Sequence, residues 1–164
     1  LNLENPDSNR LLGSWFRSSA NQVLELHGTP DKFADASFLS YWDEDDRRPS
    51  GAENALESAI QIIELTRLTP LPPNHPPLHA SAILHAGVIT SIVTDLAPGP
   101  PIVGQPVEQI FHLDEARRTA KDTILLSDSC LETLPHHILL RLREAGEVRF
   151  DNNNGLTRLF SLAN

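Results

Sequence analysis

The acidic and histidine side chains are the first residues of this chain whose types and spacing could do chemistry. The acidic run Asp43–Asp46 could hold a hard cation through its carboxylates. It leads into Arg47–Gly51, however, and charged runs beside Pro and Gly are typical of solvated loops. His136 and His137 are adjacent, and neighbouring residues on a helix point about 100° apart, so both rarely bind one ion. We therefore predict a solvated loop for the acidic run and assign no site to the histidine pair.

The cysteine content argues against disulfides and zinc. Cys130 is the single cysteine of the chain, so it has no partner for an internal disulfide and no second thiol at metal-ligand spacing. A small, buried side chain is the expected role for such a residue. Because disulfides are typical of oxidising compartments, we predict a reducing, cytoplasmic location.

Length and charge narrow the classes of function. The 164 residues suit one domain with a real core, residues 1–164. The formal net charge of −9, without a concentrated Lys/Arg face, argues against nucleic-acid binding. No run of about 18 apolar residues occurs, so this domain is not expected to insert into a membrane. The chain starts at Leu1 and contains no methionine, so we expect other domains of a longer parent chain.

Three stretches have the apolar spacing of amphipathic helices. The first is Asn5–Leu26, which we expect to end at His27-Gly28. The second is Ala52–Leu68, which stops before a proline-rich connector. The third is Gln105–Arg118, with Phe111 among the residues expected to face inward. A further capped helical segment is predicted to start at Ser127.

Strands are predicted between these helices. Lys32–Trp42 is rich in aromatic residues and has no internal Gly or Pro, which predicts a strand. We expect Leu78–Leu84 to pair with Gly87–Val93 as a hairpin, and a short strand at Thr123–Leu126. A closing hairpin is predicted across the turn at residues 151–155. This order predicts an α+β fold in which helices pack on a mixed or antiparallel sheet.

In this order, several motifs of the chain resemble the class III nucleotidyl cyclase homology domain, the catalytic module of adenylyl and guanylyl cyclases. The motifs that carry the resemblance are Leu26–Phe33 with Phe38–Trp42, Ile83–Ile89, Ile102–Val107, Thr123–Ser127 and Gly146–Val148. The first of these is similar to the family hairpin Asp-Lys-Phe-x-Gly-Asp. The resemblance implies a ferredoxin-like sandwich and covers nearly the whole chain, which would lack the family's first strand.

The family's catalysis uses two divalent ions, Mg or Mn, held by two aspartates. The first aspartate lies on the strand that this chain lacks. The second should follow a glycine in the hairpin, but a gapless match places Asp35 on the glycine and Ala36 on the aspartate. Because neighbouring strand residues point to opposite faces, Asp35 would serve as a metal ligand only if a bulge restored its direction.

Other family positions are altered as well. Lys32 falls on a position that helps select adenine, and its usual partner corresponds to Pro101, which has no side-chain donor or acceptor and no backbone N–H. We therefore favour an exposed strand lysine. Glu108 replaces the family's ribose-orienting asparagine and would repel a polyphosphate. His112 replaces the arginine that stabilises transition-state charge, and we favour a surface or interface histidine.

These changes favour a cyclase-like signalling domain that is catalytically inactive and acts as a dimerisation or regulatory module. No cofactor is expected for it. The implied partner is a second copy or another cyclase domain. Two alternatives stay open: an active adenylate or guanylate cyclase with Mg or Mn, using Asp35, and a domain that senses an uncharged or cationic small ligand without turnover.

Overall fold

The computed structural model describes residues 6–34, 36–44, 49–71, 77–92, 102–117, 124–150 and 155–162. Its elements, in chain order, are α1 (Pro6–Glu25), β1 (Thr29–Ala34), β2 (Ser37–Tyr41), α2 (Gly51–Leu68), β3 (Ala82–Leu84), β4 (Thr90–Ser91), β5 (Ile102–Val103), α3 (Gln105–Arg117), β6 (Ile124–Ser127), the 3₁₀ turn η1 (Asp128–Cys130), α4 (His136–Leu139), β7 (Leu142–Arg149) and β8 (Leu156–Leu162).

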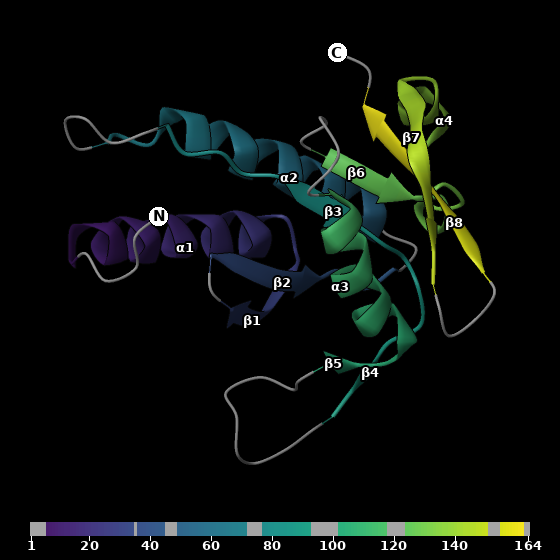
Figure 1. Cartoon of the computed structure of the whole chain (residues 1–164), viewed down its shortest axis with the longest axis horizontal. Helices are drawn as coiled ribbons and strands as arrows, with labels where there is room; N and C mark the ends of the chain where they lie inside the picture. Colours follow the sequence, from purple (N-terminus) through teal and green to yellow (C-terminus); the bar gives the residue numbers. More distant parts are fainter. Residues whose placement is uncertain are drawn as a thin grey trace.

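The strands form one mixed sheet and two separate pairs. The largest sheet has the order β3-β6-β8-β7, in which β3 and β6 are parallel and the other neighbours are antiparallel. The pairs β1-β2 and β4-β5 are both antiparallel. In Figure 1, α1 and α2 lie side by side, and β4 and β5 lie at one end of the molecule. The predicted α+β class with a mixed sheet is confirmed.

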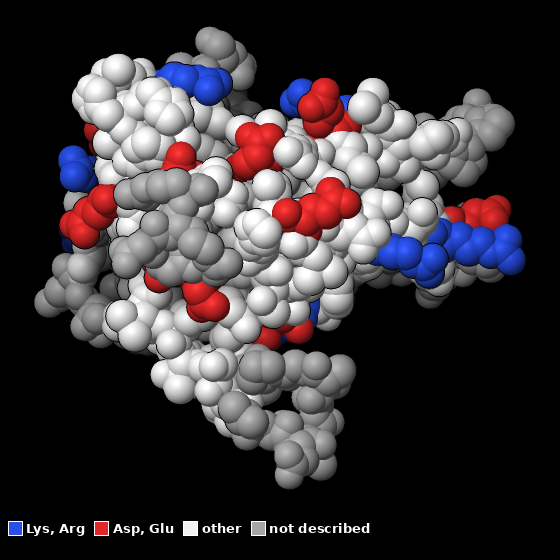
Figure 2. Space-filling view, turned by 180° about the vertical axis from the view of Figure 1, so that it is seen from behind, with Lys and Arg blue, Asp and Glu red and all other residues white. Residues whose placement is uncertain are grey.

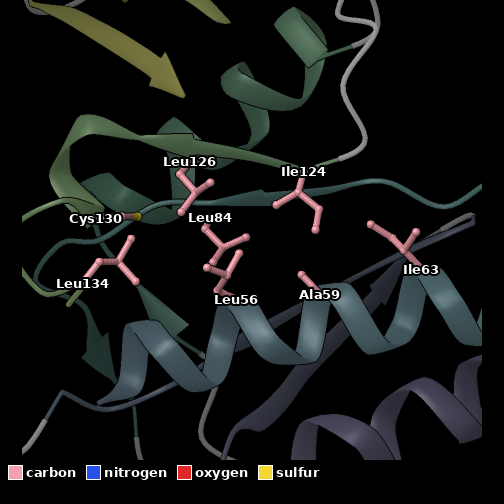
Figure 3. Close-up of a cluster of buried hydrophobic side chains, with 8 residues drawn as sticks. All are labelled: Leu56, Ala59, Ile63, Leu84, Ile124, Leu126, Cys130 and Leu134. Carbon is pink, nitrogen blue, oxygen red and sulfur yellow. The ribbon is translucent and has the colours of Figure 1, made fainter. Parts of the chain in front are cut away.

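The core forms around β6, whose apolar residues face both sides of the sheet. Ile124 and Leu126 join a cluster with side chains of α2, and Figure 3 shows the α2 side chains pointing toward this strand. Leu125 between them faces the other way, into a cluster with Leu113 of α3. All four β6 residues are buried, as expected for a short apolar run covered on both faces.

Helix α2 is held at its start by a capping box. The Ser50 hydroxyl accepts from the Glu53 N–H at 3.2 Å, and the Glu53 carboxylate accepts from the Ser50 N–H at 2.8 Å. The Ser50 hydroxyl also donates to the Thr133 carbonyl at 3.3 Å. This cap therefore ties the start of α2 to the segment between η1 and α4.

Helix α1 ends as predicted at His27-Gly28. His27 has φ 61°, and the Gly28 N–H donates to the Val23 carbonyl at 2.8 Å, which closes the helix. Gly28 is needed for a close approach, because a Cβ there would collide with the Trp42 indole. The indole Nε1–H in turn donates to the Leu26 carbonyl at 2.9 Å. The end of α1 is thus fixed to the residue that follows β2.

Three local predictions are wrong. Lys32–Trp42 is not one strand, because it contributes the end of β1 and all of β2, which pair as the antiparallel hairpin that the resemblance implies. The partner of β3 is β6, about 40 residues later, while β4 pairs with β5 instead of β3. Phe111 of α3 is 54% exposed. A local hydrophobic pattern does not specify a parallel partner that is distant in the sequence.

Candidate functional site

The hairpin that carries the predicted site is short and tightly paired. Ala34 pairs with Ser37, so residues 35 and 36 connect the strands. Asp35 lies outside the described residues, and Ala36 is exposed at the connection. The structure has a bulge earlier, between Pro30 and Lys32. The conditional hypothesis that Asp35 is a metal ligand only if a bulge restores its direction therefore stays a hypothesis.

Asp31, the extra residue of this bulge, is a buried carboxylate that sequence reasoning missed as a site residue. Its side chain is 4% exposed, and Oδ2 lies 2.8 Å from Lys32 Nζ, without the alignment of a hydrogen bond. Its Oδ1 accepts from the Ile102 N–H at 3.3 Å. Acidic residues are rarely this buried unless they are paired, and here Lys32 is the partner.

Lys32 forms an ion pair with this carboxylate and remains partly exposed. Its side chain is 41% exposed, which agrees with the favoured interpretation of an exposed strand lysine. Pro101, the predicted counterpart of Lys32, lies outside the described residues. The N–H of the next residue, Ile102, donates a hydrogen bond to the Asp31 carboxylate, so the start of β5 contacts the hairpin.

A cavity of about 370 Å³ lies beside the hairpin. Lys32 and Ala36 line it, together with side chains of α1, α2, β3 and α3, and its lining is mainly apolar. Ser40 and Ser58 also line the cavity, and their hydroxyl oxygens are buried without a hydrogen-bond partner. The structure therefore brings two of the predicted site residues to one cavity.

Glu108 and His112 lie on α3 but do not line this cavity. Glu108 is exposed in the first turn of α3, where the positive end of the helix dipole stabilises a carboxylate. The exposed His112 ring packs edge-on against Phe150, with centroids 6.2 Å apart. This contact agrees with the favoured surface role of His112.

A second polar group, around His85, joins β3, β6 and α3. His85 Nε2 lies 3.0 Å from Gln109 Oε1, and Nδ1 lies 2.9 Å from Ser127 Oγ. With the amide oriented in this way, Nε2 carries the proton and Nδ1 accepts from the Ser127 hydroxyl. Burial lowers the pKa of His85 below 6.5, outweighing the Gln109 hydrogen bond and the Asp128 charge, which raise it.

The His85 group resembles a nucleophile with its base, but its burial favours a structural role. Ser127 is 0% exposed. Burial also raises the pKa of the neighbouring Cys130 thiol, which keeps it protonated. Cys130 is free and buried, as predicted. A nucleophile must reach its substrate, so we assign this group to holding the strand ends and α3 together.

The remaining predicted features are placed as follows. Asp43 and Glu44 are exposed, in agreement with a solvated acidic loop, and residues 45–48 lie outside the described part. His136 and His137 are exposed on α4. Among the described residues, no group of three or more His, Cys, Asp or Glu side chains could hold a metal ion. Within the same residues, no helix is long and apolar enough to cross a membrane.

Figure 2 shows one face of the molecule, on which acidic side chains are scattered and the Lys and Arg side chains lie mostly near the margins. This distribution agrees with the net charge of −9. Phosphate backbones are bound by concentrated basic surfaces.

Comparison with known proteins supports the fold. No protein-family model matches the sequence, and no characterised protein matches it by sequence. Solved structures do match. A bacterial light-regulated adenylyl cyclase has a TM-score of 0.72 at 12% identity, over 93% of this chain and 44% of that protein. The chain thus spans less than half of that relative.

Two further matches cover most of both chains. The adenylyl cyclase CyaB from P. aeruginosa has a TM-score of 0.71 at 15% identity, over 99% of this chain and 85% of that chain. The non-canonical dimeric guanylyl cyclase domain of the RhoGC fusion protein from the aquatic fungus Blastocladiella emersonii has a TM-score of 0.66 at 17% identity, over 94% of this chain and 82% of that chain. The fold predicted from the sequence resemblance is confirmed: this chain has the fold of adenylyl and guanylyl cyclase domains.

Proposed function

We propose that this chain is a cyclase-like signalling domain that forms no cyclic nucleotide and acts by pairing with a second copy of itself. The observation that carries the proposal is Ala36 at the connection of the β1-β2 hairpin. Two-metal chemistry requires a carboxylate at the position that Ala36 occupies in the resemblance, and a methyl group binds no cation.

The surroundings of Ala36 support the same proposal. Lys32 lies 2.8 Å from the buried Asp31 carboxylate, so its charge is already partly balanced. In the resemblance, Glu108 occupies the position that orients the ribose, so its carboxylate would repel an anionic substrate bound there. Each lost electrostatic contact typically costs about 2.7–4 kcal/mol of barrier stabilisation, so several losses together leave little rate enhancement.

Exposed apolar residues on the β4-β5 pair support the pairing role. Val88, which precedes β4, is 90% exposed, Ile92 is 43% exposed and Val103 is 41% exposed. Large apolar side chains that are exposed on one pair of strands are candidates for an interaction surface. One of the structurally similar cyclase domains forms a non-canonical dimer, and a double mutant of the same domain is monomeric. We assign the pairing surface to this end of the molecule.

A product assay tests the inactive state. The purified protein is incubated with ATP or GTP and with Mg²⁺ or Mn²⁺, and cyclic nucleotide and thermal shift are measured. We expect no product. Product that is lost in Asp35→Ala but kept in the exposed control Glu57→Ala would establish an active cyclase. A thermal shift without product would support small-ligand sensing.

Sedimentation tests the pairing. We expect the unmodified chain to dimerise and Val88→Asp to shift it to monomer, because a buried, unpaired carboxylate opposes association. Leu140→Asp, at a residue that is 73% exposed on another part of the surface, is the matched control and should leave the dimer intact. A monomer at all concentrations would contradict the pairing role.

A further inference from the structure

The exposed surface of α3 carries two side chains of the types that bind transition-metal ions. Glu108 and His112 are four residues apart in this helix, so they are neighbours on one of its sides. Both residues are exposed. A different side of α3 is used for packing, because Leu113 is 0% exposed and belongs to a core cluster. A carboxylate and an imidazole one helical turn apart can bind the same ion.

The ligand atoms of these two side chains are not used by other interactions. Among the described residues, the Glu108 carboxylate has no hydrogen bond or ion pair, and the His112 nitrogens have no hydrogen bond. The His112 ring contacts Phe150, with centroids 6.2 Å apart and ring planes at 69°. A ring contact of this kind restricts the imidazole but uses no nitrogen lone pair. Less side-chain entropy is therefore lost when the imidazole binds an ion.

The types of ligand select the ion. Mg²⁺ and Ca²⁺ prefer oxygen ligands, whereas an imidazole suits Zn²⁺ and related ions. The net charge of −9 favours the approach of cations in general. We propose that Glu108 and His112 bind a Zn²⁺ ion, with water in its remaining coordination positions. Two protein ligands make an open and reversible site, which agrees with the lack of a three-residue metal group among the described residues.

A bound ion would change what this surface of α3 attracts. The Glu108 carboxylate by itself repels anions, whereas a divalent cation beside it makes the local charge positive. An anionic group could then approach α3 only when the ion is present. The site uses no residue of the β1-β2 hairpin, so the proposal holds whether or not the domain forms a cyclic nucleotide.

Isothermal titration calorimetry with ZnCl₂ tests the proposal on the unmodified chain and on variants whose folding is checked by circular dichroism. We expect His112→Asn and Glu108→Gln each to weaken Zn²⁺ binding by about tenfold or more, because even the groups that support metal ligands contribute that much to affinity. His137→Asn, at an exposed histidine of α4, is the matched control and should leave the affinity unchanged. MgCl₂ should bind far more weakly than ZnCl₂ at this site.

A nuclear magnetic resonance titration locates the ion. Zn²⁺ should shift the ring signals of His112 and of Phe150, which contacts it, more than those of His136 and His137. Glu108→His should bind Zn²⁺ more tightly than the unmodified chain, because it places two imidazoles at the same helical spacing. No binding by the unmodified chain, an unchanged affinity in His112→Asn, or shifts confined to His136 and His137 would each overturn the proposal. A Glu108→His variant that binds no more tightly would overturn it as well.

Discussion

Strands β6 and β2 lie in the same domain, but their surroundings differ. β6 is paired on both edges, with β3 and β8, and side chains of α2 and α3 cover its two faces. β2 is paired with β1 alone within the described residues, and it borders a cavity. The apolar residues of β6 are fully used in packing, whereas Phe33 of the hairpin stays 51% exposed. Within the described residues, β6 is therefore enclosed by packing and pairing on all sides, whereas the hairpin borders open volume.

Two buried serines show the same contrast. Ser127 and Ser58 are both 0% exposed. Ser127 Oγ lies within hydrogen-bond distance of His85 and Ser129, whereas Ser58 Oγ has no partner. Burial is therefore the same in the two regions. They differ in whether the buried hydroxyl has a hydrogen-bond partner. Substitutions that act on packing, close approach, hydrogen bonding and charge can test this difference.

The largest effect is expected from the β6 core. Leu126 is 0% exposed, so Leu126→Ala removes contacts that the surrounding elements cannot replace. We expect it to lower the free energy of unfolding by about 2–5 kcal/mol in urea denaturation. Leu140→Ala, at a residue that is 73% exposed, should change it by less than about 0.5 kcal/mol. Similar losses for both would show that β6 is not the centre of the core.

The close approach at the end of α1 should give the next effect. Gly28→Ala places a methyl group against the Trp42 indole, and we expect a loss of about 1–3 kcal/mol in unfolding free energy. In a Trp42→Leu background the same change should cost less, because the colliding ring is gone. Equal costs in both backgrounds would assign the loss to backbone conformation instead.

The serine pair compares the two regions directly. Ser127→Ala should lower the unfolding free energy by about 1–3 kcal/mol, because it leaves buried partners unsatisfied. Ser58→Ala removes a hydroxyl that has no partner, so we expect no loss and up to about 1 kcal/mol of gain. Thermal unfolding of both variants at one pH measures the difference. A loss for Ser58→Ala comparable to that of Ser127→Ala would mean that the cavity hydroxyl is already satisfied.

The smallest effect concerns pH. Burial lowers the folded-state pKa of His85 below the value of 6.5 that applies when the chain is unfolded. As the pH falls, His85 therefore takes up a proton at a higher pH in the unfolded chain than in the folded chain. The free energy of unfolding should then fall as pH decreases from 6.5 toward the folded pKa. Above pH 6.5 this group contributes no pH dependence. His85→Gln should flatten this part of the stability profile, and an unchanged slope would assign it to other groups.

The sequence allowed the local elements and the fold family to be predicted. Local sequence is enough for these elements: apolar spacing predicts the helices α1 and α2, and a short apolar run predicts the strand β6. The pairing of β3 with β6 could not be predicted this way, since parallel partners are joined by a long crossover. Matching Ala36 and Glu108 to family positions predicts altered chemistry, which stays a prediction, and it gives no sign that Asp31 is buried.

Other site features depend on contacts that spacing does not encode. The Asp31 carboxylate is buried because Ile102 comes back to the hairpin, about 70 residues later in the chain. The exposure of Phe111 depends on how α3 packs on the sheet. The helical period alone wrongly predicted that this side chain faces inward. Burial and unpaired edges become visible only when the tertiary arrangement is known.

The bond between Asp31 and Ile102 has a mechanical consequence. Asp31 Oδ1 accepts from the Ile102 N–H at 3.3 Å, and Ile102 begins β5, the strand that pairs with β4 at the apolar end of the molecule. The Asp31 side chain therefore cross-links the β1-β2 hairpin to the start of β5, so the two antiparallel pairs of strands are tied together without belonging to one sheet.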